Sequence, residues 1–139
     1  MYYLQSENSF DAAHFLTGYD GKCRHIHGHR WRVTAKVYGE GLQSEGSERG
    51  MLVDFGTLKR DLKDITDGFD HALIVEAGGA LQALLDLLVE EGFHIVTVPF
   101  RTTAECFARY FFEVLKERGH AVAEVTVYET PTNAATYAE

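Results

Sequence analysis

Apolar and polar residues alternate in two stretches of the first forty residues. In residues 2–14, aromatic and aliphatic side chains share the even positions that lead to His14. In residues 29–38, the odd positions from Trp31 onward are apolar and the even positions are polar. Because successive side chains of a strand point to opposite faces, each stretch is predicted to be a β-strand with one buried face.

Three later stretches repeat apolar residues every three or four positions, as amphipathic helices do. The first covers about 56–67 and the second about 80–91, and each stops before a glycine. The third begins at Thr-Thr-Ala-Glu, residues 102–105, whose spacing is that of a capping box, and its apolar stripe continues to Gly119. We therefore expect three helices packed on a sheet.

Three short stretches complete the predicted elements. Residues 95–98 are mostly β-branched and end at a proline, which favours a short strand. Residues 122–129 alternate again, and the tail at 134–137 is expected to pair back on them as a hairpin. The polar, glycine-rich segment 39–50 is interpreted as a loop within the domain.

Size and composition favour a single domain over residues 1–139. The chain is 45% hydrophobic and 24% charged, which is close to the globular average. No apolar run approaches the roughly 20 residues of a membrane-spanning helix. Two cysteines cannot form a disulfide framework, and the first residues lack the pattern of a signal peptide, so we expect a cytoplasmic protein.

The distribution of charge is uneven along the chain. The formal net charge of -8 argues against a general nucleic-acid or membrane-surface binder. Residues 21–39 nevertheless hold five basic residues and no acidic one. The remaining chain is therefore strongly acidic, and the positive charge is concentrated in one segment.

Four of the seven histidines fall within or next to that basic segment, at His14, His25, His27 and His29. Residues two apart on a strand share a face, so any two of the last three could bind one ion. An antiparallel return through residues 15–26 would bring His14 beside them. Three imidazoles with an open fourth position are typical of catalytic zinc.

Cys23 leaves the type of site open. It could close the metal shell as a fourth ligand, which would make the site structural, or it could be a free nucleophile or base beside the metal. The whole cluster could also be no more than a solvated basic turn.

The motifs of this sequence, taken in order, resemble those of the 6-pyruvoyltetrahydropterin and 6-carboxytetrahydropterin synthase family. The resemblance spreads over most of the chain, and the Cys-x-x-x-His-Gly-His string with an upstream Ala-Ala-His is its most specific part. The matching segments are Phe10–His14, Cys23 with His27–His29, Gly50–Phe55, Asp70–His71, Thr102–Glu105 and Tyr128–Thr130.

This resemblance implies a particular fold and metal site. The expected fold is the α+β tunnelling fold (T-fold), in which an antiparallel sheet carries helices on one face and oligomerisation, as trimers or hexamers, closes a barrel. The resemblance implies that His14, His27 and His29 bind Zn²⁺ and that Cys23 is catalytic. His25 would then be only a neighbour of the site.

Three further residues gain a role only through the resemblance. Asp70 and His71 would complete a proton relay with the cysteine, whereas without the family they would read as a loop feature. Glu129 lies in register with the apolar side of its strand and would anchor a pterin ring, unless it is a surface acid before a turn. Glu105 is explained by its capping-box position, and His94 and His120 are expected to be solvated.

The implied activity is 6-carboxy-5,6,7,8-tetrahydropterin synthesis from 7,8-dihydroneopterin triphosphate, on the pathway to queuosine. A 6-pyruvoyltetrahydropterin synthase, a non-catalytic structural zinc protein and a zinc hydrolase are the alternatives. The basic segment would attract the triphosphate of the substrate. Residues 79–98 form an insertion that the most compact family members lack, and it could line the site or cover an edge of the sheet.

Overall fold

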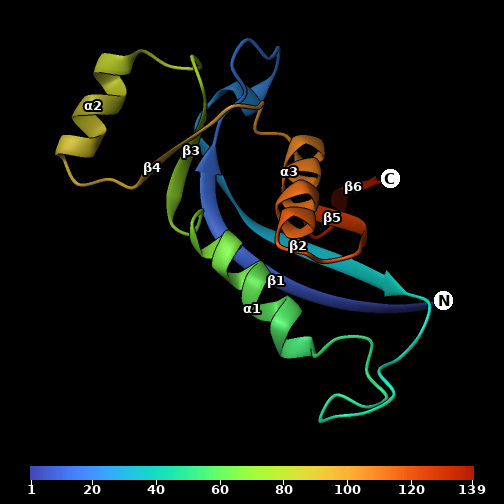
Figure 1. Ribbon diagram of the computed structural model, residues 1–139. Helices are drawn as coiled ribbons and strands as arrows, with labels where there is room; N and C mark the ends of the chain where they lie inside the picture. Colours follow the sequence, from blue (N-terminus) through green and yellow to red (C-terminus); the bar gives the residue numbers. More distant parts are fainter.

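The computed structural model describes residues 1–139 and consists of one six-stranded sheet and three helices (Figure 1). The strand order across the sheet is β4-β3-β1-β2-β5-β6. The elements are β1 (Tyr2–His14), a 3₁₀ turn η1 (Lys22–Arg24), β2 (His27–Gly39), α1 (Phe55–Asp67), β3 (Ala72–Glu76), α2 (Gln82–Glu90), β4 (Ile95–Val98), α3 (Ala104–Glu117), β5 (Val122–Thr130) and β6 (Asn133–Ala138).

A long antiparallel pair, β1 and β2, forms the centre of the sheet. Its register runs without a break from Tyr2 opposite Gly39 to His14 opposite His27. Both predicted strands are confirmed, and β2 begins two residues earlier than its alternation suggested. In this register Phe10 lies opposite Trp31, so the two apolar faces coincide.

The sheet is mixed, because its two ends are built differently. Strands β5 and β6 continue the antiparallel pairing expected from the sequence. Strands β3 and β4 instead pair in parallel, β3 with the end of β1 and β4 with β3. Helix α2 makes the crossover between β3 and β4, and a crossover of this kind is what parallel neighbours require. Strand β3 was absent from the predicted elements.

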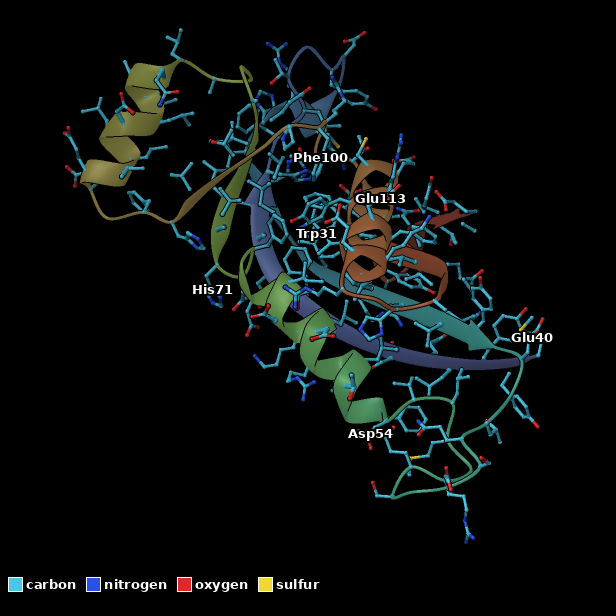
Figure 2. All side chains as sticks on the ribbon, in the orientation of Figure 1. Trp31, Glu40, Asp54, His71, Phe100 and Glu113 are labelled. Atoms are coloured by element: carbon cyan, nitrogen blue, oxygen red, sulfur yellow. The ribbon has the colours of Figure 1, made fainter.

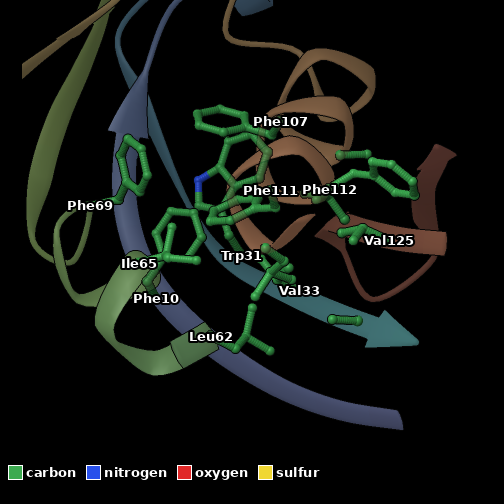
Figure 3. Close-up of a cluster of buried hydrophobic side chains, with 14 of the residues drawn as sticks. Phe10, Trp31, Val33, Leu62, Ile65, Phe69, Phe107, Phe111, Phe112 and Val125 are labelled. Atoms are coloured by element: carbon green, nitrogen blue, oxygen red, sulfur yellow. The ribbon is translucent and has the colours of Figure 1, made fainter. Parts of the chain in front are cut away.

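Helices α1 and α3 cover one face of the sheet and enclose the core with it (Figure 1). Figure 3 shows Phe10 and Trp31 of the central strands facing Phe107 and Phe111 of α3, with Leu62 of α1 beside them. The Phe10 and Trp31 rings stack with centroids 6.1 Å apart, and Phe107 lies 5.1 Å from Trp31. Aromatic packing therefore joins α3 to the centre of the sheet.

Helix α2 departs from the arrangement expected for all three helices. Figure 1 shows it beside β3 and β4, on the other side of the sheet edge from α1 and α3. Its one buried residue, Leu85, lines a hollow with Leu73, whose neighbour Ile74 belongs to the core on the opposite face. None of the three helices combines the length and apolar character needed to cross a membrane.

The expectation that His120 is solvated is wrong. Its side chain is only 8% exposed, and its Nε2 lies 2.8 Å from Asp61 Oδ2. The contact joins the segment after α3 to α1. Arg118, at the end of α3, also contacts Asp64 of α1 at 2.7 Å. These charges connect α1 to the end of α3.

Truncation of the core should show how much α3 contributes to stability. Phe107→Ala removes a fully buried ring and should lower the free energy of unfolding by about 3–5 kcal/mol. Phe55→Ala is the matched control, because that ring is 65% exposed and its loss should change stability by about 0.5 kcal/mol or less. Urea unfolding at one protein concentration measures both, and equal losses would contradict the core described above.

Candidate metal centre and adjoining cavity

The register of the central strands decides which histidines meet. His14 ends β1 directly opposite His27, the first residue of β2, and His29 follows on the same face. The ring centroids of His14 and His27 are 4.6 Å apart, and those of His27 and His29 are 4.9 Å apart. His25 precedes the strand and is exposed. The pairing that the sequence left open is thus His27 with His29.

A carboxylate completes this cluster from the neighbouring strand. Because β5 pairs with β2, Glu129 lies close to His29, and its Oε1 lies 3.2 Å from Nε2 of both His14 and His29. The ligand atoms of His14, His27, His29 and Glu129 all lie within 4.8 Å of one another. We call these four residues the histidine cluster.

The hydrogen bonds of the imidazoles aim their Nε2 atoms into the cluster. His14 Nδ1 donates to the carbonyl oxygen of Thr102 at 2.8 Å, and His27 Nδ1 donates to that of His25 at 2.6 Å. A carbonyl only accepts, so the proton of each neutral ring is on Nδ1 and a lone pair is on Nε2. Metal-binding histidines are commonly oriented in this way.

Three buried nitrogen atoms remain without a hydrogen-bond partner, the Nε2 atoms of His14, His27 and His29. Buried polar atoms without partners are rare and call for an explanation. A metal ion placed among them would satisfy all three at once. The donor set therefore fits a metal that prefers nitrogen ligands.

The electrostatics of the cluster favour a bound cation. Burial lowers the pKa of His29, which keeps this imidazole neutral and free to donate its lone pair. Contact with His14 holds the pKa of Glu129 below its ordinary value. Imidazole lone pairs and a carboxylate converge here, and a bound cation would be attracted to all of them.

Cys23 lies beside the histidine cluster rather than within it. The 3₁₀ turn holds this residue, and Leu16 N–H donates to its carbonyl oxygen at 2.9 Å. Cys23 lines a cavity of about 270 Å³ together with Glu105 and Glu129. Its thiol is not among the grouped ligand atoms. The geometry thus separates a metal position from a neighbouring thiol, with Glu129 between the two.

The sequence interpretation assigned Glu105 to a capping box, and the structure shows otherwise. The capping box expected at 102–105 does not form, because Thr103 is the N-cap and its Oγ1 accepts a hydrogen bond from Cys106 N–H at 3.3 Å. Glu105 is therefore free to line the cavity, and the buried Thr102 orients His14. The only signal in the sequence was that both residues belong to a motif of the resemblance.

Asp70 and His71 form a couple, but away from the cavity. His71 Nδ1 lies 2.8 Å from Asp70 Oδ2, and Asp11 N–H donates to Asp70 Oδ1 at 2.9 Å. The bond from Asp11, followed by that from His71, lowers the pKa of Asp70. The His71 side chain is 79% exposed, and Figure 2 shows it beside the ribbon where α1 passes into β3.

The face of the sheet explains this separation. Asp11 and Arg30, 3.1 Å apart, alternate with the cluster residues on β1 and β2 and so point to the opposite face. His71 lines a hollow together with Asp11 and Arg30, and neither Asp70 nor His71 lines the cavity of Cys23. Within one chain, the structure does not bring the expected relay together.

Another hollow lies away from the histidine cluster. It measures about 670 Å³ and includes Lys36 and Lys116 at the far end of the sheet. Both lysines are already paired, with Glu124 and Glu139. Because neither cysteine and no residue of the histidine cluster lines it, the chemistry points to the smaller cavity of Cys23.

Comparison with known sequences identifies relatives along the whole chain. A family model described as 6-pyruvoyl tetrahydropterin synthase matches residues 3–139. A 6-carboxy-5,6,7,8-tetrahydropterin synthase from Haemophilus influenzae is 36% identical, and the match covers 100% of both chains. The protein of the same name from Synechocystis is 33% identical over 99% of this chain and 93% of its own length.

Solved structures share the fold. An uncharacterized protein from Wolinella succinogenes has a TM-score of 0.83 at 23% identity, covering 99% of this chain and 98% of its own. The 6-pyruvoyl tetrahydropterin synthase of Plasmodium falciparum has a TM-score of 0.72 at 19% identity, covering 99% and 97%. These likenesses confirm the expected tunnelling fold of the subunit. Taken with the full-length sequence match, they show that the chain belongs to the 6-pyruvoyl tetrahydropterin synthase family of enzymes.

Proposed function

We propose that this chain is a zinc-dependent 6-carboxy-5,6,7,8-tetrahydropterin synthase. It converts 7,8-dihydroneopterin triphosphate to the 6-carboxy product, with release of acetaldehyde and triphosphate, on the cytoplasmic route to queuosine. The observation that carries this proposal is that Cys23 shares a cavity with Glu129, whose carboxylate lies 3.2 Å from the buried Nε2 atoms of His14 and His29. The name of full-length relatives such as that of Haemophilus influenzae supports this choice within the family.

The proposed metal ligands are His14, His27 and His29. Three imidazoles that leave one position open are the donor set of catalytic zinc sites. When bound there, zinc would polarise an oxygen of the substrate side chain and make proton removal from the neighbouring carbon easier. Thr102 and the carbonyl of His25 keep the rings in position.

Glu129 has the proposed role of binding the pterin ring. Its carboxylate lines both the cavity of Cys23 and a second hollow of about 420 Å³ next to Arg30 and Arg32. Once a metal ion binds the imidazole nitrogens, the carboxylate of Glu129 is free to accept hydrogen bonds from the exocyclic amine and ring N–H of a pterin. Charge-assisted hydrogen bonds of this kind contribute about 1.5–3 kcal/mol each.

Cys23 is the proposed base, and the couple of Asp70 and His71 the proposed relay. Asp70 accepts the proton of His71 Nδ1, which leaves His71 Nε2 free to take up or release a proton. Because Cys23 and His71 do not share a cavity within one chain, we infer that the relay comes from a neighbouring copy in a homo-oligomer. The exposure of His71 supports this assignment.

The basic segment has the proposed role of attracting the triphosphate. Arg24 adjoins Cys23 in the 3₁₀ turn, and both Arg24 and Arg30 are exposed. On a chain whose net charge is -8, this local positive region would direct an anionic substrate toward the site.

Product analysis tests the reaction. Purified protein incubated with dihydroneopterin triphosphate should release acetaldehyde and triphosphate, and mass spectrometry should detect 6-carboxytetrahydropterin. Triphosphate release with a pyruvoyl product and no acetaldehyde would instead indicate a 6-pyruvoyltetrahydropterin synthase. No conversion of the pterin by the zinc-loaded protein would contradict both activities.

Replacing single histidines tests the metal ligands. His27→Ala removes one of the three imidazoles and should reduce bound zinc at least tenfold, measured by elemental analysis after dialysis. His25→Ala is the matched control, because it removes an exposed imidazole and keeps the backbone carbonyl that orients His27. Equal zinc loss in both variants would argue against the proposed ligand set.

Replacing Cys23 separates a catalytic thiol from a structural ligand. Cys23→Ala should keep its zinc and its unfolding midpoint while kcat falls by roughly 10²-fold or more, since a positioned acid or base contributes on that scale. Cys106→Ala, in which the half-buried thiol of α3 is removed, should keep most of the activity. Loss of zinc and of folded structure in the Cys23 variant would favour the non-catalytic zinc protein.

A further inference from the structure

The loop between β1 and β2 carries Cys23 and borders two different hollows. It consists of residues 15–26, and we call it the Cys23 loop. Leu16 and Cys23 line the cavity of about 270 Å³ beside the histidine cluster. A separate hollow of about 460 Å³ against α2 is lined by other residues of the same loop, Phe15, Arg24, His25 and Ile26. One side of the loop therefore faces the candidate site, and the other faces the segment that contains α2.

Hydrogen bonds hold the two ends of the Cys23 loop. The hydroxyl group of Thr102 donates to the carbonyl oxygen of Phe15 at 3.3 Å. At the other end, His27 Nδ1 donates to the carbonyl oxygen of His25 at 2.6 Å. These two bonds fix the points at which the loop leaves β1 and enters β2.

A further hydrogen bond joins the loop to the segment between β3 and α2. Thr17 Oγ1 donates to the carbonyl oxygen of Gly79 at 3.0 Å. Gly79 is itself held by a tight turn at the end of β3, because its N–H donates to the carbonyl oxygen of Glu76 at 2.8 Å. The contact, which we call the Thr17–Gly79 bond, thus ties the loop to the edge of the sheet.

The close approach of the two segments requires a glycine at position 79. A Cβ atom at Gly79 would lie 2.9 Å from Thr17 Oγ1 and 2.8 Å from the carbonyl oxygen of Glu76. Both distances are too short for a side-chain carbon, and glycine is the residue that permits such an approach. The turn at the end of β3 is therefore shaped to receive the hydroxyl group of Thr17.

We propose that Thr17 is a positioning residue, which holds the Cys23 thiol in place through the Thr17–Gly79 bond. This role rests on the proposed function, in which Cys23 acts as a base. A base works only within a narrow range of distance and orientation to the proton that it removes. The insertion 79–98 would then support the site from outside, since none of its residues lines the cavity of Cys23.

Replacing the hydroxyl group tests this role in the zinc-loaded enzyme. Thr17→Val keeps a branched side chain and should lower kcat about three- to tenfold, as expected for the loss of one hydrogen bond that holds the active loop conformation. KM for dihydroneopterin triphosphate should stay within about twofold. Thr17→Ser keeps the hydroxyl group and should restore the kcat of the wild type.

A change at the acceptor shows whether the bond itself is responsible. Gly79→Ala should lower kcat as well, because its Cβ atom would displace the hydroxyl group of Thr17. Gly41→Ala is the matched control, since a Cβ atom there has no other atom within 4 Å. The double variant of Thr17→Val and Gly79→Ala should be no slower than Gly79→Ala alone, because one bond is lost only once. Losses that multiply would contradict the proposal.

Thiol alkylation locates Cys23 without turnover, and so separately from the proposed reaction. In Thr17→Val, the half-buried Cys23 should react with iodoacetamide at least threefold faster, with Cys106 of α3 as the internal standard in peptide mass spectrometry. An unchanged alkylation rate of Cys23, or an unchanged kcat, would overturn the proposal. If the wild type converts no pterin, the proposed function fails, whereas faster alkylation in the variant still supports the positioning of the thiol by Thr17.

Discussion

The unbroken pairing of β1 with β2 is the constraint on which the rest of the structure depends. A slip of one residue would turn His14 or the pair of His27 and His29 to the other face, and it would also turn Phe10 away from Trp31. The same register therefore fixes both the aromatic core and the metal centre. Because the core loses its packing if the register changes, the positions of the imidazoles are held by the stability of the whole sheet.

Helix α3 connects the aromatic core to the metal centre. Its apolar side packs on Trp31 through Phe107, and the residues just before its first turn reach the histidine cluster. Thr102 accepts the proton of His14 Nδ1 there, while Glu105 faces the cavity of Cys23. The start of one helix thus orients a metal ligand and supplies an acid to the adjoining cavity. Changes in the core can accordingly affect the site without touching it.

The proposed site needs side chains that one chain does not bring together. His71 lines a hollow with Asp11 and Arg30 and lies outside the cavity of Cys23. In the proposed relay, a neighbouring copy of the chain supplies the couple of Asp70 and His71, which one chain keeps apart from its own Cys23. The uneven charge along the sequence suits such contacts, because acidic and basic regions of different copies can meet.

Alternation and helical periodicity determined most of the elements of this protein, including β1, β2, β5 and the core helices, because these patterns are local. The clustering of histidines around Cys23 likewise predicted a metal site. The sequence could not show β3, whose five residues carry no clear period, or the parallel pairing at that edge. Only tertiary structure decided that His27 joins His29, that Thr103 rather than Thr102 caps α3, and that Asp70 and His71 lie apart from Cys23. Each of these depends on which face of a strand meets which neighbour, and residues far apart in sequence settle that.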